Sequence, residues 1–439
     1  MKRVVGPSLF VIALCAASAA WAQALPRADP AKVGVSAERL ERIGQAFQKE
    51  IDAGKLPGAV MMVARDGQLV YAKTLGHQDK DAGKAMEEGS IFRIYSMTKP
   101  LVSVAAMILY EEGRIELTDP VSKFLPEFDN LQVSKATLDP FGKVTYATEP
   151  VARKPTVQDL LRHTAGLAYG EITQNAVVKE GYAKAGLYKP ADRDYDSRSM
   201  SPEEQVKAIA QVPLVHQPGT RWEYSLASDI LGRVVEKAAG MRLSEFLEQR
   251  VFQPLKMNDS GFSVAQADLP RLAEPLKTDP ATGTPNKLID VSAVPANDSG
   301  GAGAVSTAAD YLRFTQMLLN GGELDGARIL SPTTIRLMAS DHLGERIQPV
   351  LSPGELLLGT PGYSFGLGFS VRGQDGIAGV SGSAGEYMWA GYAGTFFWVD
   401  PEEDLTAVLM TQAPGPSRPY YRKLFKQLVY QSVVETHAN

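Results

Sequence analysis

Ser96-Met97-Thr98-Lys99 is the most informative stretch of the chain. A serine hydroxyl is a poor nucleophile at neutral pH and needs a base within hydrogen-bond reach. Residues three apart lie on one face of a helix, so the amine of Lys99 can reach the hydroxyl of Ser96. Pro100 fits only in the first helical turn, which predicts a helix beginning near Ser96. The backbone N–H of Ser96 then has no helical partner and can stabilise an oxyanion.

The tetrapeptide alone is weak, because a chain of this length and average composition contains Ser-x-x-Lys about once or twice by chance. Two further segments give it context. Residues 218–225 read Pro-Gly-Thr-Arg-Trp-Glu-Tyr-Ser and place Tyr224 at the end of a loop, before a predicted helix. Residues 387–392 read Tyr-Met-Trp-Ala-Gly-Tyr, a predicted strand in which Gly391 lets a ligand approach the backbone.

These three segments, in this order, resemble the serine β-lactamase and penicillin-binding-protein superfamily, whose signature begins with Ser-x-x-Lys. The resemblance extends to residues 117–121, 124–126, 159–167 and 300–303. It implies that Ser96 is the acylated nucleophile, Lys99 its activating partner, and Tyr224 the shared base and later acid. It also implies that the backbone N–H groups of Ser96 and Tyr392 form the oxyanion hole.

Two departures from the family pattern indicate one branch of the superfamily. Many relatives read Tyr-x-Asn at the second motif, with the Asn holding a substrate amide, whereas Leu226 stands here. Many also carry Lys-Thr-Gly on the strand, with a cation for the β-lactam carboxylate, whereas this chain reads Trp389-Ala390-Gly391. An aromatic motif beside Ser-Met-Thr-Lys is similar to the family VIII carboxylesterases, which hydrolyse small acyl esters. We therefore expect Trp389, Gly391 and Leu226 to contact an uncharged ester.

The resemblance implies a serine carboxylesterase that cleaves small esters through an acyl-enzyme and uses no cofactor or metal. A class C-like β-lactamase or D-Ala-D-Ala peptidase is the alternative, because Arg372, Arg418 or Lys189 could replace the missing cation. A non-catalytic peptidoglycan- or lactam-binding protein is the alternative from another class. The five histidines lack ligand spacing, and the formal charge of -5 disfavours nucleic acid as a partner. The sequence does not indicate an oligomeric state.

Another serine and a histidine compete for catalytic roles. Gly362-Tyr363-Ser364-Phe365-Gly366 matches the Gly-x-Ser-x-Gly elbow of ordinary esterases. An elbow lies between a strand and a helix, but the residues after Ser364 have the pattern of a strand. His163 lies at a predicted helix end, where we expect it to form hydrogen bonds rather than to catalyse. The loop 171–200 either caps the acyl site or lies in solvent.

Residues 1–22 form a predicted export signal. Lys2 and Arg3 precede an apolar run over residues 4–20, and small residues around Ala22 provide a cleavage site. Cleavage there would remove Cys15, the single cysteine, so the remaining chain forms no disulfide. We expect a periplasmic or secreted protein that has no stable membrane insertion after removal of the signal.

The pattern of the remaining chain predicts an α+β fold of the β-lactamase/transpeptidase type. Apolar spacing predicts helices beginning near Ser36, over 308–319 and from about 419, and a hairpin over 58–73. Strand-like runs cover 364–371, 387–392, 395–399 and 405–411. We expect residues 23–115 and 290–439 to form one discontinuous domain, an antiparallel sheet flanked by helices, with a mainly helical domain inserted at 116–289. The active site would lie in the cleft between the two domains.

Overall fold

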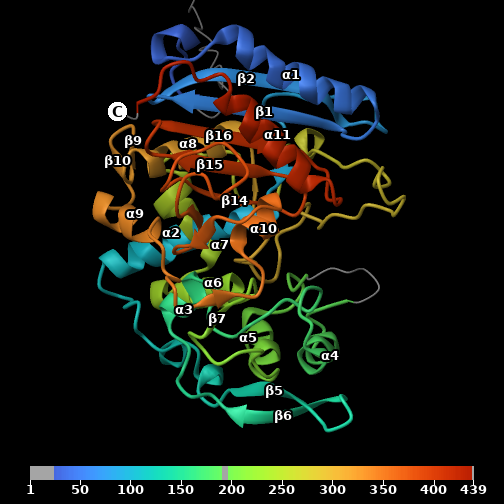
Figure 1. The fold of residues 1–439 in the computed structure, drawn as a ribbon, viewed down its shortest axis with the longest axis vertical. Helices are drawn as coiled ribbons and strands as arrows, with labels where there is room; N and C mark the ends of the chain where they lie inside the picture. Colours follow the sequence, from blue (N-terminus) through green and yellow to red (C-terminus); the bar gives the residue numbers. More distant parts are fainter. Residues whose placement is uncertain (1–23, 190–195, 438–439) are drawn as a thin grey trace, which may run out of the picture.

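The computed structural model describes residues 24–189 and 196–437, so the predicted signal peptide lies outside the described residues. Its main feature is an eight-stranded antiparallel sheet with the strand order β12-β13-β14-β15-β16-β1-β2-β3 (Figure 1). In chain order, the strands of this sheet are β1 (Gly58–Arg65), β2 (Gln68–Asp79), β3 (Lys84–Ala85), β12 (Tyr363–Phe365), β13 (Ser370–Arg372), β14 (Tyr387–Ala390), β15 (Phe396–Asp400) and β16 (Leu405–Met410).

This sheet is built from strands that lie near both ends of the sequence. β1 and β2 form the predicted hairpin, with Asp66 and Gly67 at positive φ in its turn. β14, β15 and β16 form the antiparallel meander predicted near the C-terminus. β1 pairs with β16, with Val60 opposite Met410, so stretches far apart in sequence build one sheet. The prediction of an antiparallel sheet made from both ends is confirmed.

Helices cover both faces of the sheet. Successive side chains of a strand point to opposite faces, and two neighbours on β15 show this arrangement. Phe397 packs against Tyr311 of α8 (Ala308–Leu319), whereas Trp398 packs against Phe425 of α11 (Arg418–Tyr430). Phe47 of α1 (Ala37–Asp52) also contacts Phe425, so α1 and α11 share one face. These aromatic contacts form the core on the two sides of the sheet.

Helices are the commonest regular elements of residues 116–289, which also contain a hairpin that was not predicted; the mainly helical domain stays a prediction. The helices are α3 (Val157–Leu161), α4 (Ala176–Lys184), α5 (Pro202–Ala210), α6 (Ala227–Ala239), α7 (Leu243–Leu247) and the π-helical turn Glu248–Phe252. The hairpin consists of β5 (Gln132–Leu138) and β6 (Val144–Pro150) and lies at the end of the molecule farthest from α1 (Figure 1). The boundaries at 115/116 and 289/290 stay a prediction.

Most local predictions agree with the structure, and one is wrong. α1 begins directly after Ser36, whose side chain accepts a hydrogen bond from the N–H of Arg39, and α8 covers the predicted residues 308–319. Residues 364–371 are not one strand. They divide into β12 and β13, which pair with each other. Gly368, at a φ of 97°, lets the chain reverse between them.

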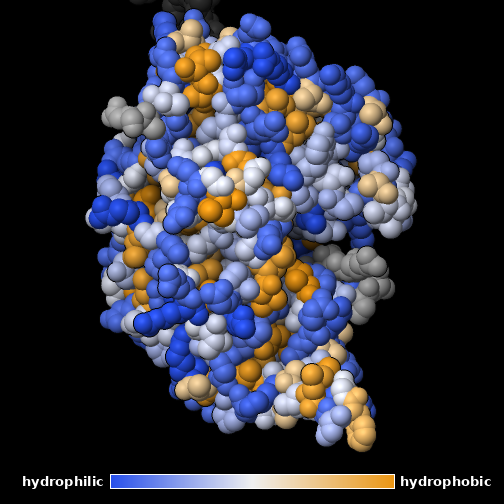
Figure 2. All heavy atoms as spheres, viewed as in Figure 1, coloured by the Kyte–Doolittle hydropathy of each residue, from blue (hydrophilic) through white to orange (hydrophobic). Residues whose placement is uncertain are grey.

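Apart from α2 (Thr98–Glu111), the remaining elements are short. They are α9 (Pro332–Met338), α10 (Pro353–Leu358), the 3₁₀ turns Pro30–Val33, Tyr95–Met97, Val121–Lys123, Pro126–Phe128 and Leu269–Arg271, and the two-residue strands β4 (Phe92–Arg93), β7 (Arg221–Trp222), β8 (Val305–Ser306), β9 (Glu323–Leu324), β10 (Ala327–Arg328) and β11 (Gln348–Pro349). On the face in Figure 2, hydrophobic residues gather between the level of α10 and the β5–β6 hairpin. Within the described residues, no helix has the length and apolar character to span a membrane.

Candidate active site

Ser96 lies in the 3₁₀ turn that leads into α2 (Thr98–Glu111). Pro100 is the third residue of α2, inside the first turn, where its missing N–H costs no helical hydrogen bond. Tyr95 has a φ of 46°, an unusual value for a residue other than glycine, and its hydroxyl accepts a hydrogen bond from the N–H of Ile289. Twelve of the 14 residues of α2 are buried, so the helix is a rigid support for Ser96.

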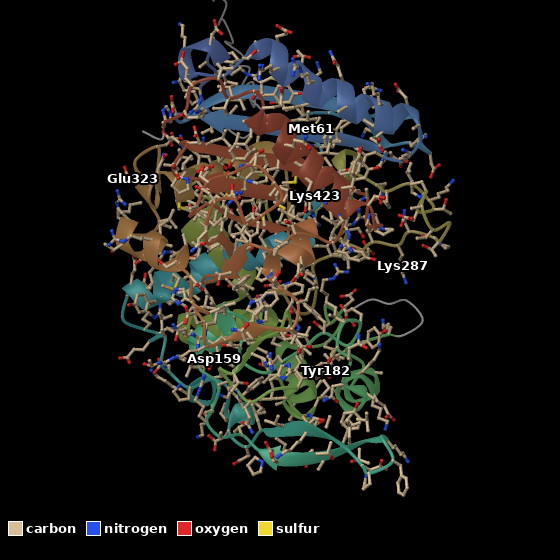
Figure 3. All side chains as sticks on the ribbon, in the orientation of Figure 1. Met61, Asp159, Tyr182, Lys287, Glu323 and Lys423 are labelled. Atoms are coloured by element: carbon tan, nitrogen blue, oxygen red, sulfur yellow. The ribbon has the colours of Figure 1, made fainter. Side chains whose placement is uncertain are left out.

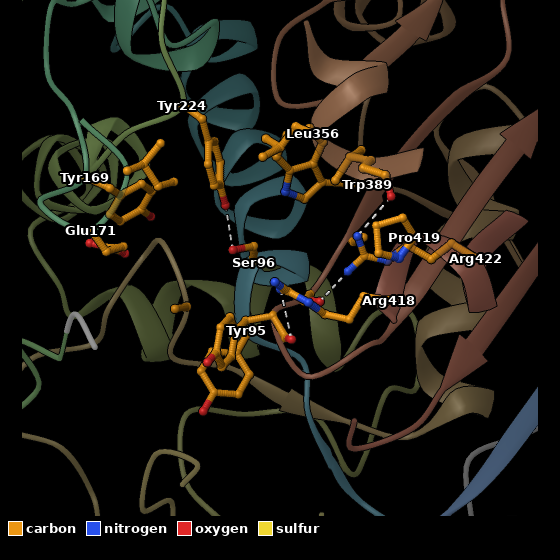
Figure 4. Close-up of a pocket in the computed structure, with 16 residues that line it drawn as sticks. Tyr95, Ser96, Tyr169, Glu171, Tyr224, Leu356, Trp389, Arg418, Pro419 and Arg422 are labelled. Atoms are coloured by element: carbon orange, nitrogen blue, oxygen red, sulfur yellow. Dashed lines mark hydrogen bonds between the residues drawn. The ribbon is translucent and has the colours of Figure 1, made fainter. Parts of the chain in front are cut away.

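The hydroxyl of Ser96 receives hydrogen bonds from both predicted partners. Tyr224 donates its hydroxyl hydrogen to Ser96 Oγ at 2.6 Å (Figure 4), and Lys99 Nζ donates to the same atom at 3.2 Å. Lys99 is almost completely buried, and its Nζ lies 4.8 Å from the centre of the Tyr224 ring. The structure therefore brings Ser96, Lys99 and Tyr224 together, although Tyr224 is 128 positions away from Ser96.

Lys99 has two further hydrogen-bond partners that sequence reasoning missed. Its Nζ donates to the hydroxyl of Tyr169 at 3.0 Å and to the carbonyl of Gly301 at 2.6 Å. A lysine ammonium group has three N–H donors, so Ser96, Tyr169 and Gly301 occupy all of them. The amide of Gly301 in turn donates to the buried carboxylate of Asp229 at 3.2 Å. Lys99 is thus held in one orientation by residues from three parts of the chain.

Asp159 anchors the loop that carries His163 and Tyr169. Its buried carboxylate accepts hydrogen bonds from the guanidinium groups of Arg153, at 2.6 Å, and Arg162, at 3.1 Å (Figure 3 labels Asp159). The carbonyl of His163 accepts a hydrogen bond from the N–H of Glu223, which directly precedes Tyr224. This link places the loop beside the Tyr224 segment and explains why the Tyr169 and Tyr224 rings lie 5.1 Å apart.

His163 packs behind Tyr224 and has no hydrogen bond to Ser96 among the described contacts. Its ring centre lies 5.2 Å from that of Tyr224, and its Nδ1 lies 3.1 Å from the hydroxyl of Ser225. Burial, followed by the positive charge of Lys99, lowers the pKa of His163 well below its usual range. A neutral, hydrogen-bonded imidazole agrees with the prediction that His163 is not a catalytic residue.

Gly391 allows the end of β14 to lie against the segment before Ser96. A Cβ at this position would come within 2.4 Å of the carbonyl oxygen of Ile94 and 2.2 Å of Thr395 Oγ1. The next residue, Tyr392, has its ring centre 5.3 Å from that of Tyr95. Residues 391–392 therefore lie beside residues 94–95. The assignment of the Ser96 and Tyr392 N–H groups to an oxyanion hole stays a prediction.

A cavity of about 250 Å³ opens at Ser96. Of the predicted substrate contacts, Trp389 and Gly391 line it, with Tyr169, Tyr224 and Leu356 (Figure 4). Leu226 does not line it, because its side chain is buried in the core at the beginning of α6. The structure therefore does not bring Leu226 together with the other predicted contacts, and its assignment to substrate binding stays a prediction. The motif position suits a polar side chain in many relatives, but a leucine there gains more from burial in the core.

Two arginines at the beginning of α11 also line the cavity. The guanidinium of Arg418 lies 4.8 Å from the ring centre of Tyr392, and Arg422 donates to the carbonyl of Gly391 at 2.7 Å. Burial and the neighbouring charge of Arg418 lower the pKa of Arg422 to about 9. Of the three predicted replacement cations, only Arg418 lines this cavity within the described residues. Arg372 lies 3.4 Å from the buried carboxylate of Glu386, and Lys189 does not reach the cavity.

The competing serine lies in a different environment. Ser364 belongs to β12 and is followed by β13 rather than by a helix, and its hydroxyl donates to Asp341. His437, the only histidine after it in sequence, contacts Asp66 at 2.7 Å. Ser364 therefore has neither the elbow geometry nor the histidine of an ordinary esterase. In the predicted capping loop, Glu171 and Ile172 line the cavity, whereas residues 190–195 lie outside the described residues.

Comparison with known proteins gives a consistent result. Residues 43–430 match the family model described as Beta-lactamase. The chain is 35% identical to Protein Rv1367c of Mycobacterium tuberculosis, over 84% of this chain and 89% of that protein. It is 31% identical to Esterase EstB of Burkholderia gladioli, over 87% of this chain and 93% of that protein. The structure of EstCE1, a hydrolase with promiscuous acyltransferase activity, aligns with a TM-score of 0.71 and 29% identity, over 90% of this chain and 99% of EstCE1.

The chain therefore belongs to the β-lactamase family. It has the β-lactamase/transpeptidase-like α+β fold, as the sequence predicted.

Proposed function

We propose that this protein is an exported carboxylesterase that cleaves small carboxylic esters through an acyl-enzyme on Ser96. One observation carries the proposal: Ser96 Oγ accepts hydrogen bonds from both Lys99 and Tyr224 inside a cavity large enough for a small ester. A serine with two such partners at its hydroxyl has a short path for its proton, which an isolated serine lacks.

Acylation begins when Ser96 Oγ attacks the ester carbonyl and its proton passes to the hydrogen-bonded pair of Lys99 and Tyr224, which acts as the general base. The carbonyl oxygen becomes an oxyanion, which the N–H groups of Ser96 and Tyr392 stabilise. Collapse of this intermediate breaks the bond to the alcohol, and Tyr224 returns its proton to the leaving oxygen. Water then enters, gives a proton to Tyr224 and attacks the acyl carbon. When Ser96 leaves the second intermediate, it regains this proton and the acid is released.

The wall of the cavity favours an uncharged ester. Trp389 stands where a lactam-hydrolysing relative would present a cation, and its ring packs 5.4 Å from that of Tyr224. Arg418 favours a second candidate, a class C-like β-lactamase or D-Ala-D-Ala peptidase, because its guanidinium lines the cavity and could bind a carboxylate. Parallel assays with 4-nitrophenyl acetate and a chromogenic cephalosporin separate the two. Faster turnover of the cephalosporin would favour the second candidate.

The nucleophile is tested by substitution. Ser96→Ala is expected to abolish hydrolysis of 4-nitrophenyl acetate, while Ser364→Ala retains it. Mass spectrometry of the wild-type protein mixed rapidly with substrate should show an acyl adduct on the peptide that contains Ser96. Full activity of the Ser96→Ala protein would refute the proposal. Binding of the ester without turnover by the wild-type protein would favour the non-catalytic alternative.

Export is the remaining part of the proposal. The basic start, the apolar run and the small residues near Ala22 support cleavage after this residue, followed by a periplasmic or secreted location. The N-terminus of the protein recovered from a periplasmic or culture fraction should then be Gln23. A protein that retains residues 1–22 in the cytoplasm would contradict this part alone.

A further inference from the structure

A second cavity of about 460 Å³ adjoins the cavity at Ser96. Three residues, Ile172, Tyr224 and Leu356, line both cavities and form the ridge between them (Figure 4 labels Tyr224 and Leu356). The far wall of the second cavity comes from β5 and from residues 350–351, which follow β11. The N–H of Val350 donates to the carbonyl of Trp222, so this wall is fixed to the segment that carries Tyr224.

The exposed residues that line the second cavity are mainly apolar, and Gln174 is the polar one among them. Ile172, Val350 and Leu351 are 39%, 58% and 45% exposed, and all three line this cavity. Exposed aliphatic side chains are ordinary when scattered, but a group around one hollow indicates a surface that a ligand covers. Figure 2 shows hydrophobic residues on the same part of the molecule, between the level of α10 and the β5–β6 hairpin.

The charges on the wall favour an uncharged occupant. Among the described residues that line the second cavity, the titratable acid and base are Glu223 and His216, whose side chains contact each other at 2.8 Å. No lysine or arginine lines this cavity within the described residues, so it presents no permanent cation to an anionic ligand. The first cavity differs, because Arg418 lines it.

Tyr224 determines which part of an ester can reach the second cavity. Its hydroxyl lies 2.6 Å from Ser96 Oγ, and the same residue lines the second cavity. The group that protonates the leaving oxygen must lie next to that oxygen, so the alcohol leaves on the side of Tyr224. We propose, on the basis of the proposed function, that the second cavity binds the alcohol part of the ester. The preferred substrates are esters of bulky, uncharged, mainly apolar alcohols.

Ala136 and Thr137 provide a matched pair of variants. Both lie exposed on β5, where successive side chains point to opposite faces, and only Ala136 lines the second cavity. Ala136→Trp fills the cavity from an exposed position, and Thr137→Trp adds the same bulk outside it. The substrates are ethyl acetate, 2-naphthylmethyl acetate and ethyl octanoate, which vary the alcohol and the acyl group separately. Release of acid is followed in a pH-stat.

Ala136→Trp is expected to lower kcat/KM for 2-naphthylmethyl acetate by about tenfold, the effect of losing a well-filled apolar contact. Ethyl acetate and ethyl octanoate should change by less than about twofold, and Thr137→Trp should change none of the three. Leu351→Asp, on the other segment of the far wall, gives a second and independent variant with the same expected selectivity.

Three outcomes would overturn the inference. A loss with ethyl octanoate would assign the cavity to the acyl group, an equal loss with all three esters would indicate a structural defect, and no loss would leave the cavity without a role. The proposed function has a separate test, because wild-type protein that fails to hydrolyse any of the three esters contradicts the function itself.

Discussion

Substitution of Gly391 by alanine tests the predicted oxyanion hole, whose backbone N–H groups are not removed by substitutions other than proline. The new Cβ would lie 2.4 Å from the carbonyl oxygen of Ile94, whereas ordinary contacts begin at 3.4 Å. The two segments must therefore separate by about 1 Å, a displacement that can cost about 100-fold in rate. Ile94 cannot easily yield, because its carbonyl accepts the N–H of Met97 at 3.0 Å and its own N–H donates to Ala304.

The displacement moves Tyr392 away from Ser96 and should remove one donor to the oxyanion. Loss of one such donor costs about 10²–10³ in kcat, or about 2.7–4 kcal/mol in the barrier. We expect Gly391→Ala to lower kcat for 4-nitrophenyl acetate by this factor, with little change in KM, because the donor acts mainly in the transition state. Initial rates over a range of ester concentrations separate the two parameters.

Gly373→Ala is the matched control, because a Cβ there meets no atom within 4 Å. It should retain wild-type kinetics, and circular dichroism with a thermal melt should show that both variants fold. A Gly391→Ala protein that is folded and has a kcat within about threefold of wild type would refute the reasoning, since the close approach of β14 to Ile94 would then have no catalytic consequence.

Three further predictions concern buried groups near and away from the site. Tyr169→Phe removes one of the three acceptors of Lys99 Nζ and should lower kcat about tenfold with little change in KM, whereas Tyr182→Phe should not. Burial raises the pKa of Asp310 to about 7, so the folded protein loses stability as pH rises from about 4 to 7. In thermal melts, the melting temperature of Asp310→Asn should therefore rise relative to that of the wild-type protein between pH 5 and pH 8. Burial lowers the pKa of His163, so thermal melts should show that wild-type stability falls as pH drops below about 6.5. An equally steep fall in the His163→Gln protein would exclude this histidine as the cause.

Most helices and strands were predictable because the patterns that mark them involve residues that are close together in the sequence. The cap at Ser36 and the 3.6-residue period that follows it belong to one segment, and α1 begins where they indicate. The hairpin over β5 and β6 was missed because its residues are mostly exposed on both faces, so no alternation of apolar and polar residues marks the strands. Residues 364–371 were assigned to one strand because their apolar residues continue through the turn at Gly368.

The site was predictable only as far as its motifs extend. Ser96 and Lys99 share one helical turn, and Tyr224 was found through its resemblance to a known motif rather than through any local pattern. Tyr169 has no such signal, although it follows directly on the stretch 159–167 that also resembles the family. Its contact with Lys99 spans 70 positions and depends on how the loop after Asp159 packs against the Tyr224 segment. Leu226 shows the converse case, because it occupies a motif position but its side chain is buried in the core rather than in the cavity wall.

The hydrogen bonds of Lys99 explain why the site depends on the whole fold. Its three acceptors come from the turn before α2, from the loop after α3 and from the segment before α8, so no single element can hold the amine. Gly301 adds a fourth contribution, because its N–H is bonded to Asp229 on α6. If the buried ammonium loses one acceptor, the unsatisfied N–H donor destabilises this arrangement, and the amine then rotates away from Ser96 or binds water. Residues far from the cavity therefore affect catalysis through the position of one amine, without contacting the substrate.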